Sequence, residues 1–287
     1  MSVIEIIKGQ AARPDQIIMV IIFVTFILGE MIISSYRNAK LYSTPDTLTN
    51  MFLGLLTFGA LASVKGMVFV MFDFVYEHRL FDFAKEPWYY GVLYWFGLLL
   101  FNDFMFYVFH WIAHKSRFFW ALHVAHHNSK EYNFTVSIRG LFLLQVFKFP
   151  LWTVMPFFGF EPLDVFFMDS FVYFYQFWVH TKLIGRLGFL EEFMQTPVNH
   201  AVHHSVKSNE LDKNLGGVFV IWDRLFGTYL RTDEKIEFGI PNNIETENPW
   251  VVTMHEFISI WREVKQPGLS LSERFKVVFG DLPFRKF

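Results

Sequence analysis

Hydrophobic residues along the chain gather in five long runs, and short polar stretches separate them. The runs cover residues 17–33, 47–75, 88–109, 141–160 and 163–179. A helix rises about 1.5 Å per residue, so about 20 apolar residues cross a hydrocarbon layer that is about 30 Å thick. Each run approaches or exceeds this length. The pattern therefore predicts an all-α, multi-pass membrane helical bundle with four to five spans.

The last two runs are predicted to form an antiparallel hairpin that turns near Gly159–Glu161. Pro150 and Pro156 lie in the first arm, residues 141–160. Proline cannot donate a backbone hydrogen bond, so we expect these two residues to kink that arm.

Two charged residues, Lys148 and Asp169, lie inside the arms of this hairpin. Charges within a membrane are costly and are usually paired or functional. Folding about the turn brings the two residues to a similar depth, so we predict that they pair and border a substrate cavity. Alternatively, Lys148 extends toward the membrane surface and Asp169 bonds a neighbouring hydroxyl such as that of Tyr173. The cavity is predicted to lie between the spans 88–109, 141–160 and 163–179.

The chain after residue 181 contains no apolar run that is long enough to span a membrane. Within residues 250–264, apolar and aromatic residues recur at helical spacing. Such a stripe suits a helix on a membrane surface, and it equally suits a helix packed on the rest of the protein. We therefore divide the chain into a membrane-embedded catalytic unit, residues 1–230, and a C-terminal amphipathic membrane-surface tail, residues 231–287.

Composition and charge support one membrane-embedded unit, because 53% of the residues are hydrophobic and only 18% are charged. The net charge of −2 provides no basic surplus to neutralise phosphates, which argues against a nucleic-acid partner. Residues 110–140 carry four basic residues and residues 181–287 carry thirteen, whereas the loop 76–87 carries two against three acids. Basic residues favour the cytoplasmic side, so the first two segments are predicted to lie there.

The spacing of the histidines carries the candidate chemistry. Nine of the eleven histidines lie between residues 110 and 204, and eight of these form three boxes, 110–114, 123–127 and 200–204. Residues three and four apart share a helix face, so each box directs two or three imidazoles in one direction. Imidazole is a common ligand of transition-metal ions, and one such ion takes about four to six ligands. Nine imidazoles therefore predict a dinuclear metal site. The candidate ligands are His110, His114, His123, His126, His127, His180, His200, His203 and His204.

The remaining composition narrows the kind of metal site. The chain contains no cysteine, which excludes disulfides, iron–sulfur clusters and thiolate zinc sites. Ligating histidines usually donate their second ring N–H to a carboxylate or a carbonyl. Four carboxylates lie near the boxes and are candidates for that role: Asp103, Glu131, Asp212 and Asp223.

Two classes of function fit a histidine-rich metal pair at the mouth of a membrane bundle. Inserting oxygen into an unactivated C–H bond needs a redox metal with open positions, which is typically non-haem iron. The alternative is a non-redox membrane metal protein, either a zinc-dependent hydrolase or a metal transporter. A hydrolase would offer a carboxylate beside its ligands, and the boxes contain none. A transporter would place its ligands near mid-membrane, whereas these lie at the ends of the spans.

Four stretches around the boxes are similar to a known family. They are His123-Val-Ala-His-His-Asn-Ser-Lys-Glu-Tyr-Asn133, Gln176-Phe-Trp-Val-His-Thr181, Asp212-Lys-Asn-Leu-Gly-Gly217 and Ile221-Trp-Asp-Arg-Leu-Phe-Gly-Thr228. With the boxes, they resemble the fatty acid hydroxylase and sterol desaturase superfamily of membrane di-iron oxygenases, over residues 95–230. The likeness is greatest to alkylglycerol monooxygenase-like members. The chain departs from them at Asn199 and Ala201, where they tend to have a histidine and a basic residue.

The resemblance implies that the nine histidines bind two Fe ions and that no catalytic residue stands apart from the metal centre. It implies an O2-dependent oxygenase of a membrane lipid, by C–H hydroxylation, ether-lipid O-alkyl monooxygenation or desaturation. Zinc could replace iron in purified protein, because affinity alone does not favour iron. Electrons would come from an external donor, either a reduced pterin or a ferredoxin- or cytochrome-type partner. The site would face the cytoplasm, from the cytoplasmic membrane or the endoplasmic reticulum.

Overall fold

The computed structural model describes residues 14–141 and 143–282, which form helices and connecting loops. Residues 1–13 and 283–287, at the outer ends of the two predicted units, lie outside the described residues. The first helices are α2 (Pro14–Tyr36), α3 (Thr44–Glu77), α4 (Trp88–Lys115), α5 (Arg117–His127), α6 (Phe134–Ser137), α7 (Leu143–Trp152) and α8 (Val154–Phe158). The later helices are α9 (Pro162–Trp178), η1 (Gly188–Glu192), α10 (Pro197–His203), α11 (Ile221–Phe226), α12 (Pro249–Val264) and α13 (Leu271–Phe279).

Four of the five predicted apolar runs correspond to single helices, α2, α3, α4 and α9, and the run 141–160 forms the two short helices α7 and α8. In the described residues, α3 and α4 are long and apolar enough to cross a membrane, by length and composition. The apolar stretches Val20–Tyr36 and Leu143–Phe158 are shorter. The all-α fold is thereby confirmed, while the count of four to five spans stays a prediction. Helix α4 continues past its apolar run to Lys115, so the first histidine box forms its last turns.

The predicted hairpin consists of α7 and α8 as one arm and α9 as the other. Helix α7 ends at Trp152, because Pro156 has no N–H to donate to the carbonyl four residues earlier. Helix α8 ends at Gly159, whose φ of 111° is left-handed. A Cβ atom there would lie 2.1 Å from the carbonyl oxygen of Phe81, so only glycine fits this turn.

The ion pair predicted across this hairpin is present. Lys148 Nζ lies 2.5 Å from Asp169 Oδ1, and both side chains are buried. The ammonium group also lies 4.5 Å from the ring centroid of Trp152 and 4.2 Å from that of Tyr173. The turn at Gly159 therefore sets the register between the two arms as the sequence predicted.

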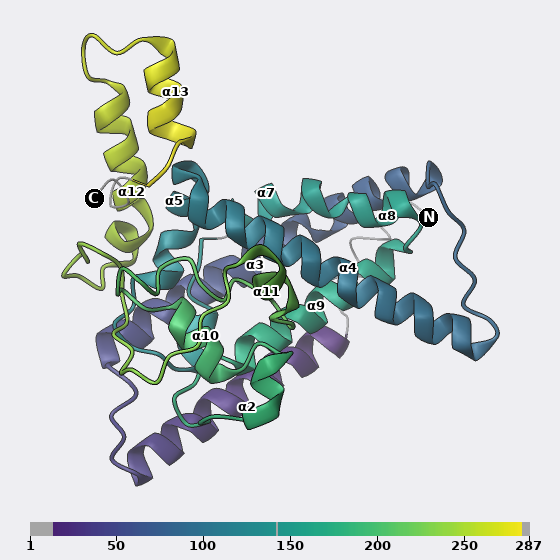
Figure 1. The fold of residues 1–287 in the computed structure, drawn as a ribbon, viewed down its shortest axis with the longest axis horizontal. Helices are drawn as coiled ribbons and strands as arrows, with labels where there is room; N and C mark the ends of the chain where they lie inside the picture. Colours follow the sequence, from purple (N-terminus) through teal and green to yellow (C-terminus); the bar gives the residue numbers. More distant parts are fainter. Residues whose placement is uncertain (1–13, 142, 283–287) are drawn as a thin grey trace.

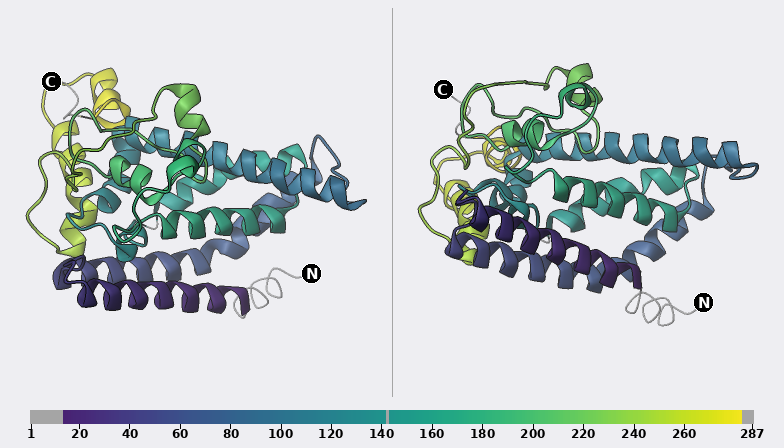
Figure 2. Two further views of the ribbon diagram at one scale, coloured as in Figure 1. Left: turned by 60° about the horizontal axis from the view of Figure 1, so that its bottom comes forward. Right: turned by 90° about the horizontal axis from the view of Figure 1, so that it is seen from below.

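The largest apolar core lies between α3, α4 and the α7–α9 hairpin. Phe72 of α3, Leu98 of α4, Trp152 of α7, Met155 of α8 and Val165 of α9 are all buried in it. Figure 2 shows that α2, α3, α4 and α9 run in broadly similar or opposite directions along the molecule. The histidine-bearing segments lie at the end of this bundle where α4 and α9 end and α3 begins (Figure 1).

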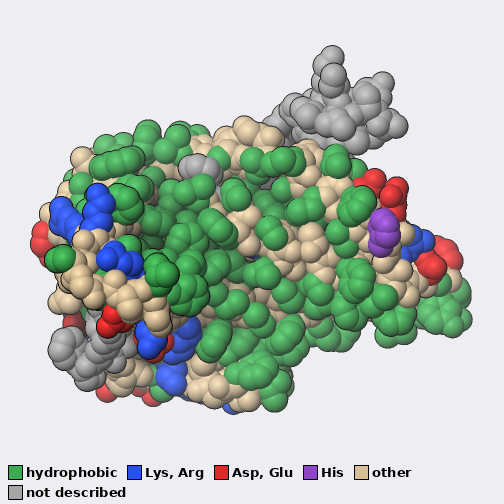
Figure 3. Space-filling view, turned by 90° about the horizontal axis from the view of Figure 1, so that it is seen from above, with side chains coloured by type: hydrophobic (Ala, Val, Ile, Leu, Met, Phe, Trp, Pro, Cys, Tyr) green, Lys and Arg blue, Asp and Glu red, His purple; other side chains and the backbone are tan. Residues whose placement is uncertain are grey.

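The long helices expose many large apolar side chains, including Ile32, Leu55, Met67 and Leu93. Figure 3 shows one side of the molecule, on which hydrophobic side chains cover the middle and charged side chains lie at the two ends. A soluble protein rarely exposes an apolar surface of this extent, and such a surface is expected to contact lipid or a partner.

The C-terminal helices form a second hairpin, in which α12 packs against α5 and α13. Arg117, the first residue of α5, anchors it: Nε lies 2.6 Å from Glu256 and Nη1 lies 2.7 Å from Glu263. The tryptophans of the predicted stripe point outward, with Trp250 66% and Trp261 60% exposed. Helix α12 crosses the ends of the long helices instead of running parallel to them (Figures 1 and 2).

Candidate metal centre

The structure brings all nine candidate histidines together in two adjoining groups. In each group, one ligand atom from every residue lies within 4.8 Å of the others. The five-histidine group consists of His110, His114, His123, His127 and His203. The four-histidine group consists of His126, His180, His200 and His204.

The helical spacing of the boxes explains how one segment serves two groups. On α4, His110 and His114 are four residues apart and join the same group. On α5, His126 and His127 are neighbours that join different groups, and their ring planes lie 87° apart. The corresponding neighbours at the end of α10 also join different groups, with ring planes 88° apart. The second and third boxes therefore bridge the two groups.

Backbone carbonyls fix the orientation of four of the rings. A carbonyl oxygen can only accept, so each bonded Nδ1 carries the proton and each Nε2 keeps its lone pair. The four bonds run from His110 Nδ1 to the carbonyl oxygen of Leu215 at 2.8 Å, from His126 Nδ1 to that of Arg139 at 3.2 Å, from His180 Nδ1 to that of Gln176 at 2.6 Å, and from His203 Nδ1 to that of Lys213 at 2.9 Å.

The Nε2 atoms converge inside each group, which tests whether a metal ion fits. His180 Nε2 lies 3.1–3.2 Å from the Nε2 atoms of the other three members of its group. His126 and His180 both hold their protons on Nδ1, so their Nε2 lone pairs face each other and need a cation between them. Two nitrogens that bind one ion at about 2.1 Å and at right angles are about 3.0 Å apart. His203 Nε2 is buried with no hydrogen-bond partner among the described residues. Both groups therefore fit a metal ion.

Burial keeps these imidazoles neutral. It lowers the pKa of His126 to about 4, although the carbonyls of Arg139 and Val136 oppose this shift. A neutral imidazole can bind a metal, whereas an imidazolium cannot, so the site is ready to bind metal at neutral pH. Burial, together with neighbouring histidines, also lowers the pKa well below its ordinary value at His123, His127, His180, His200, His203 and His204.

One of the four predicted carboxylates contacts a histidine directly. Asp212 Oδ1 lies 3.3 Å from His114 Nδ1, and its Oδ2 lies 3.0 Å from Lys115 Nζ. Asp212 is therefore placed to orient His114 and to make its ring a stronger donor to a metal.

Asp223 supports a histidine indirectly, through the backbone. Its carboxylate accepts hydrogen bonds from the backbone N–H of Leu215 at 2.7 Å and of Gly216 at 2.8 Å. These bonds hold the turn whose Leu215 carbonyl accepts from His110 Nδ1. Asp223 therefore supports His110 through the backbone.

The other two carboxylates do not contact the histidines in the described part of the chain. Asp103 is a candidate partner of the ligating histidines from sequence, but it accepts hydrogen bonds from Val218 N at 2.5 Å and from Trp222 Nε1 at 2.9 Å instead. It thus fastens the loop before α11 to α4. The hydrogen bonds of Glu131 are made by its backbone to Ser129.

Sequence reasoning missed the carbonyls of Leu215, Arg139, Gln176 and Lys213, because a backbone group leaves no residue-type signal. It also missed Tyr132, which is fully buried with its ring centroid 5.6 Å from that of His180 and 5.4 Å from that of His204.

The segment that follows residue 230 also reaches the metal centre. Residues 239–241 line a small cavity together with His114, His127 and His203. Ile240 is buried against Trp120 of α5 in one small apolar cluster. Part of the chain assigned to the membrane-surface tail therefore covers the five-histidine group.

Comparison with known proteins agrees with this geometry. Residues 95–228, which contain all nine histidines, match the family of fatty acid hydroxylases. This part of the chain belongs to the fatty acid hydroxylase family. The resemblance predicted for residues 95–230 is thereby confirmed.

Relatives of this fatty acid hydroxylase core include curated enzymes. The chain is 32% identical to alkylglycerol monooxygenase of Homo sapiens over 268 residues, which are 90% of the chain and 57% of that protein. It is 34% identical to alkylglycerol monooxygenase of Xenopus tropicalis over 261 residues, 90% of the chain and 56% of that protein. Ornithine lipid hydroxylase OlsE of Rhizobium tropici is 30% identical over 132 residues, 46% of the chain and 40% of that protein.

The chain therefore spans little more than half the length of these alkylglycerol monooxygenases. No solved structure matches the chain. Homology to oxidoreductases is shown, and the histidine groups lie within the matched region.

Proposed function

We propose that this protein is an O2-dependent non-haem di-iron oxygenase that acts on a membrane lipid. The observation that carries the proposal is the pair of adjoining groups, one of five and one of four buried histidines, at the end of an apolar helical bundle. The relatives support the substrate class, since their names describe oxidation of an alkylglycerol and of an ornithine lipid. The reaction is hydroxylation of a C–H bond of the lipid, and in an ether lipid that bond can lie beside the ether oxygen. The other possible reaction is desaturation, in which two hydrogen atoms are removed and no oxygen is inserted.

The chain's own residues supply positioning, and bound iron would supply the activation of O2. The nine histidines would hold two ions, while the carbonyl of Leu215 and the carboxylate of Asp212 keep the rings of α4 oriented. Neither histidine group includes a carboxylate, which disfavours the alternative of a zinc hydrolase, because that reaction uses a carboxylate base beside the metal. Electrons come from an external donor, either a reduced pterin or a ferredoxin- or cytochrome-type partner.

We further propose how the chain lies in the membrane. Helices α2, α3, α4 and the α7–α9 hairpin form the four to five spans of the unit 1–230, and the charged ends in Figure 3 lie at the two membrane surfaces. The basic residues of segments 110–140 and 181–287 favour the cytoplasmic side for the metal centre. We place the lipid between α4, α7 and α9, next to the Lys148–Asp169 pair, where it would have to separate side chains of the apolar core.

The C-terminal hairpin of α12 and α13 would rest on the same membrane surface. It crosses the ends of the spans, and Trp261, Leu271 and Phe275 are 60–86% exposed on it. Lipids brominated near the head group should quench tryptophan fluorescence of the wild type more than that of Trp250→Phe combined with Trp261→Phe. Equal quenching in both proteins would place the hairpin away from the lipid.

The oxygenase proposal is tested by incubating the membrane-reconstituted protein with an alkylglycerol or an ornithine lipid, a reductant and ¹⁸O2. The product should carry one ¹⁸O atom, and no product should form under argon. His200→Ala should abolish turnover, whereas His255→Ala, which changes a histidine outside both groups, should not. Lipid cleavage that proceeds equally under argon would contradict the proposal and favour a hydrolase. An active protein with fewer than two metal ions per chain would contradict the dinuclear site.

A further inference from the structure

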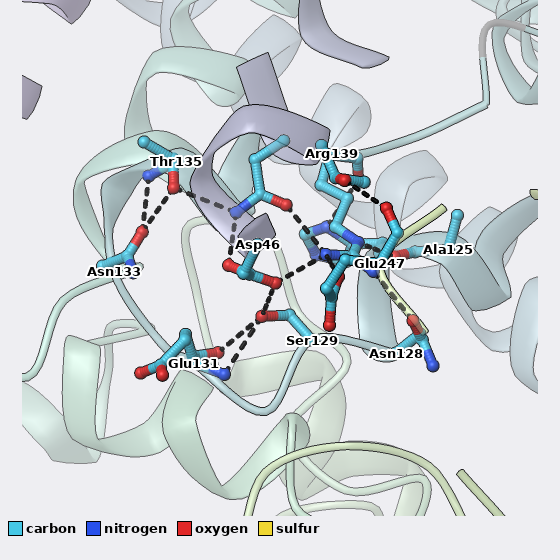
Figure 4. Close-up of polar contacts among 12 residues, drawn as sticks. Asp46, Ala125, Asn128, Ser129, Glu131, Asn133, Thr135, Arg139 and Glu247 are labelled. Carbon is cyan, nitrogen blue, oxygen red and sulfur yellow. Dashed lines mark hydrogen bonds and ion pairs between the residues drawn. The ribbon is translucent and has the colours of Figure 1, made fainter. Parts of the chain in front are cut away.

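The most completely bonded buried charge in the described residues lies beside the metal centre. The Arg139 side chain is 0% exposed, and Figure 4 shows its guanidinium surrounded by groups from distant parts of the chain. Its acceptors are Asp46 at 2.6 Å, Asn50 at 3.0 Å, the Ala125 carbonyl at 2.8 Å, Asn128 at 2.8 Å and Glu247 at 3.1 Å.

Arg139 contacts the metal centre at two points around one histidine. Its backbone carbonyl accepts a hydrogen bond from His126 Nδ1 at 3.2 Å. Its side-chain Nε donates to the carbonyl of Ala125, the residue before His126, at 2.8 Å. One residue thus holds both the ring of His126 and the backbone that carries it.

The anchor of Arg139 is itself rigid. Asp46, at the start of α3, also accepts hydrogen bonds from Ser129 Oγ at 2.7 Å and from Asn50 Nδ2 at 2.7 Å, and its side chain is 3% exposed. The backbone next to Arg139 is fixed as well, since Thr57 Oγ1 donates to the carbonyl of Gly140 at 3.1 Å. The arginine carbonyl therefore cannot shift without breaking bonds to α3.

The charges explain how an arginine can sit beside a cation site. An unpaired guanidinium would repel a metal ion, but Asp46 and Glu247 both pair with Arg139, so this cluster carries no excess positive charge. Arginine suits this place because its fork reaches several acceptors at once, which the single ammonium group of lysine cannot do.

We propose that Arg139 is a positioning residue for His126 and thereby sets the metal affinity of the four-histidine group. The proposal rests on the proposed function only in that it requires both groups to bind metal. Loss of the guanidinium removes the bonds from residue 139 to Asp46 and to the Ala125 carbonyl, so the ring of His126 is held less firmly in place and the affinity of that group falls. Comparable losses of a ligand's outer partner lower metal affinity by about 10–100-fold.

The test is a Co²⁺ titration of the metal-free, full-length protein in detergent, followed by the visible absorption of bound cobalt. The wild type should bind two ions. Arg139→Gln should weaken the binding of one ion by about 10–100-fold and leave the other unchanged. Arg139→Lys should behave like Arg139→Gln, because it keeps the charge but loses the fork.

The matched control is Arg117→Gln. Arg117 is also buried, at 3% exposed, and also bonds two carboxylates, which belong to α12. Among the described residues, its hydrogen bonds reach neither a histidine of the two groups nor a residue next to one. This variant should lower the unfolding temperature and keep both cobalt affinities. If Arg139→Gln lowers the unfolding temperature as the control does and both cobalt affinities stay at the wild-type value, Arg139 has only a structural role and the proposal is overturned.

Double variants identify which ion is affected. Arg139→Gln should add no further loss to His126→Ala, because both act on one ligand, whereas it should add its full loss to His114→Ala, which belongs to the other group. The reverse pattern would overturn the assignment to His126. A wild type that binds two cobalt ions but oxidises no lipid with iron would contradict the proposed function and leave this test of Arg139 valid. A wild type that binds one ion would overturn both.

Discussion

Replacing Lys148 by Met removes one partner of the ion pair inside the bundle and leaves Asp169 without its cation. Lys148 Nζ is 2.5 Å from the carboxylate, and the two side chains are only 2% and 12% exposed. Breaking such a buried pair from one side costs about 3–5 kcal/mol, because the remaining charge is not compensated by water. The variant also loses the contact of the ammonium group with the Trp152 ring, which contributes about 2 kcal/mol when desolvated.

Combining Lys148→Met with Asp169→Asn removes both charges, so only the loss of the ring contact and of packing remains. We therefore expect the double variant to be more stable than Lys148→Met alone. Its loss of unfolding free energy should be far smaller than the sum of the losses in the two single variants. The free energy of unfolding would be measured by reversible denaturation in mixed detergent micelles. If the double variant loses as much as the two single variants added together, the residues do not interact and the reasoning is wrong.

A second ion pair on the same helix provides the control. Lys85 Nζ lies 2.6 Å from Asp164 Oδ2 near the start of α9, but the lysine side chain is 33% exposed. This lysine keeps access to water and also pairs with the half-exposed Glu161, and ion pairs that water reaches contribute about 0–1 kcal/mol. Lys85→Met should therefore cost less than about 1 kcal/mol, and a loss as large as that of Lys148→Met would show that burial is not the cause.

Three further predictions follow from the site and the fold. Asp212→Asn should lower the metal affinity of the five-histidine group about 10–100-fold, measured by cobalt titration, whereas Lys115→Met should not, because it leaves the Asp212–His114 contact intact. The histidines of α5 and α10 have a pKa below 6.5 in the folded protein, so the unfolded chain binds more protons than the folded one below that pH. As the pH falls below about 6.5, the metal-free protein should therefore lose stability, and the metal-loaded protein should release its metal. Stability that does not change between pH 7 and 5 would contradict this. Gly159→Ala should lower the unfolding temperature, since it adds a methyl group 2.1 Å from the Phe81 carbonyl and costs more than about 1–2 kcal/mol, whereas Gly185→Ala, where open space surrounds the position, should not.

The sequence predicted best those features that depend on local periodicity. Helical spacing placed His110 and His114 on one face, and the turn at Gly159 brought Lys148 to Asp169 because the two arms have a fixed rise per residue. These predictions needed no knowledge of how distant segments pack.

Contacts between distant segments could not be predicted in this way. Asp103 lies two helical turns from His110, and periodicity alone placed them on one face, but the loop that arrives before α11 takes up the carboxylate. His110 instead bonds the carbonyl of Leu215, 105 residues away. The tail contributes similarly, since Glu247 reaches Arg139 although the stripe of α12 indicated only an amphipathic helix.

The division of the boxes between the two groups restricts which parts of the protein can move at the metal centre. Helices α5 and α10 each provide histidines to both groups, so moving either helix as a whole would disturb both groups, whereas turning a single ring such as that of His126 would disturb one. Among movements of whole segments, only those of α4, which serves the five-histidine group, and of His180 after α9, which serves the four-histidine group, would shift one group alone. Because α4 and α9 also border the apolar core, a molecule that displaces one of these helices would move the histidines of one group and not those of the other.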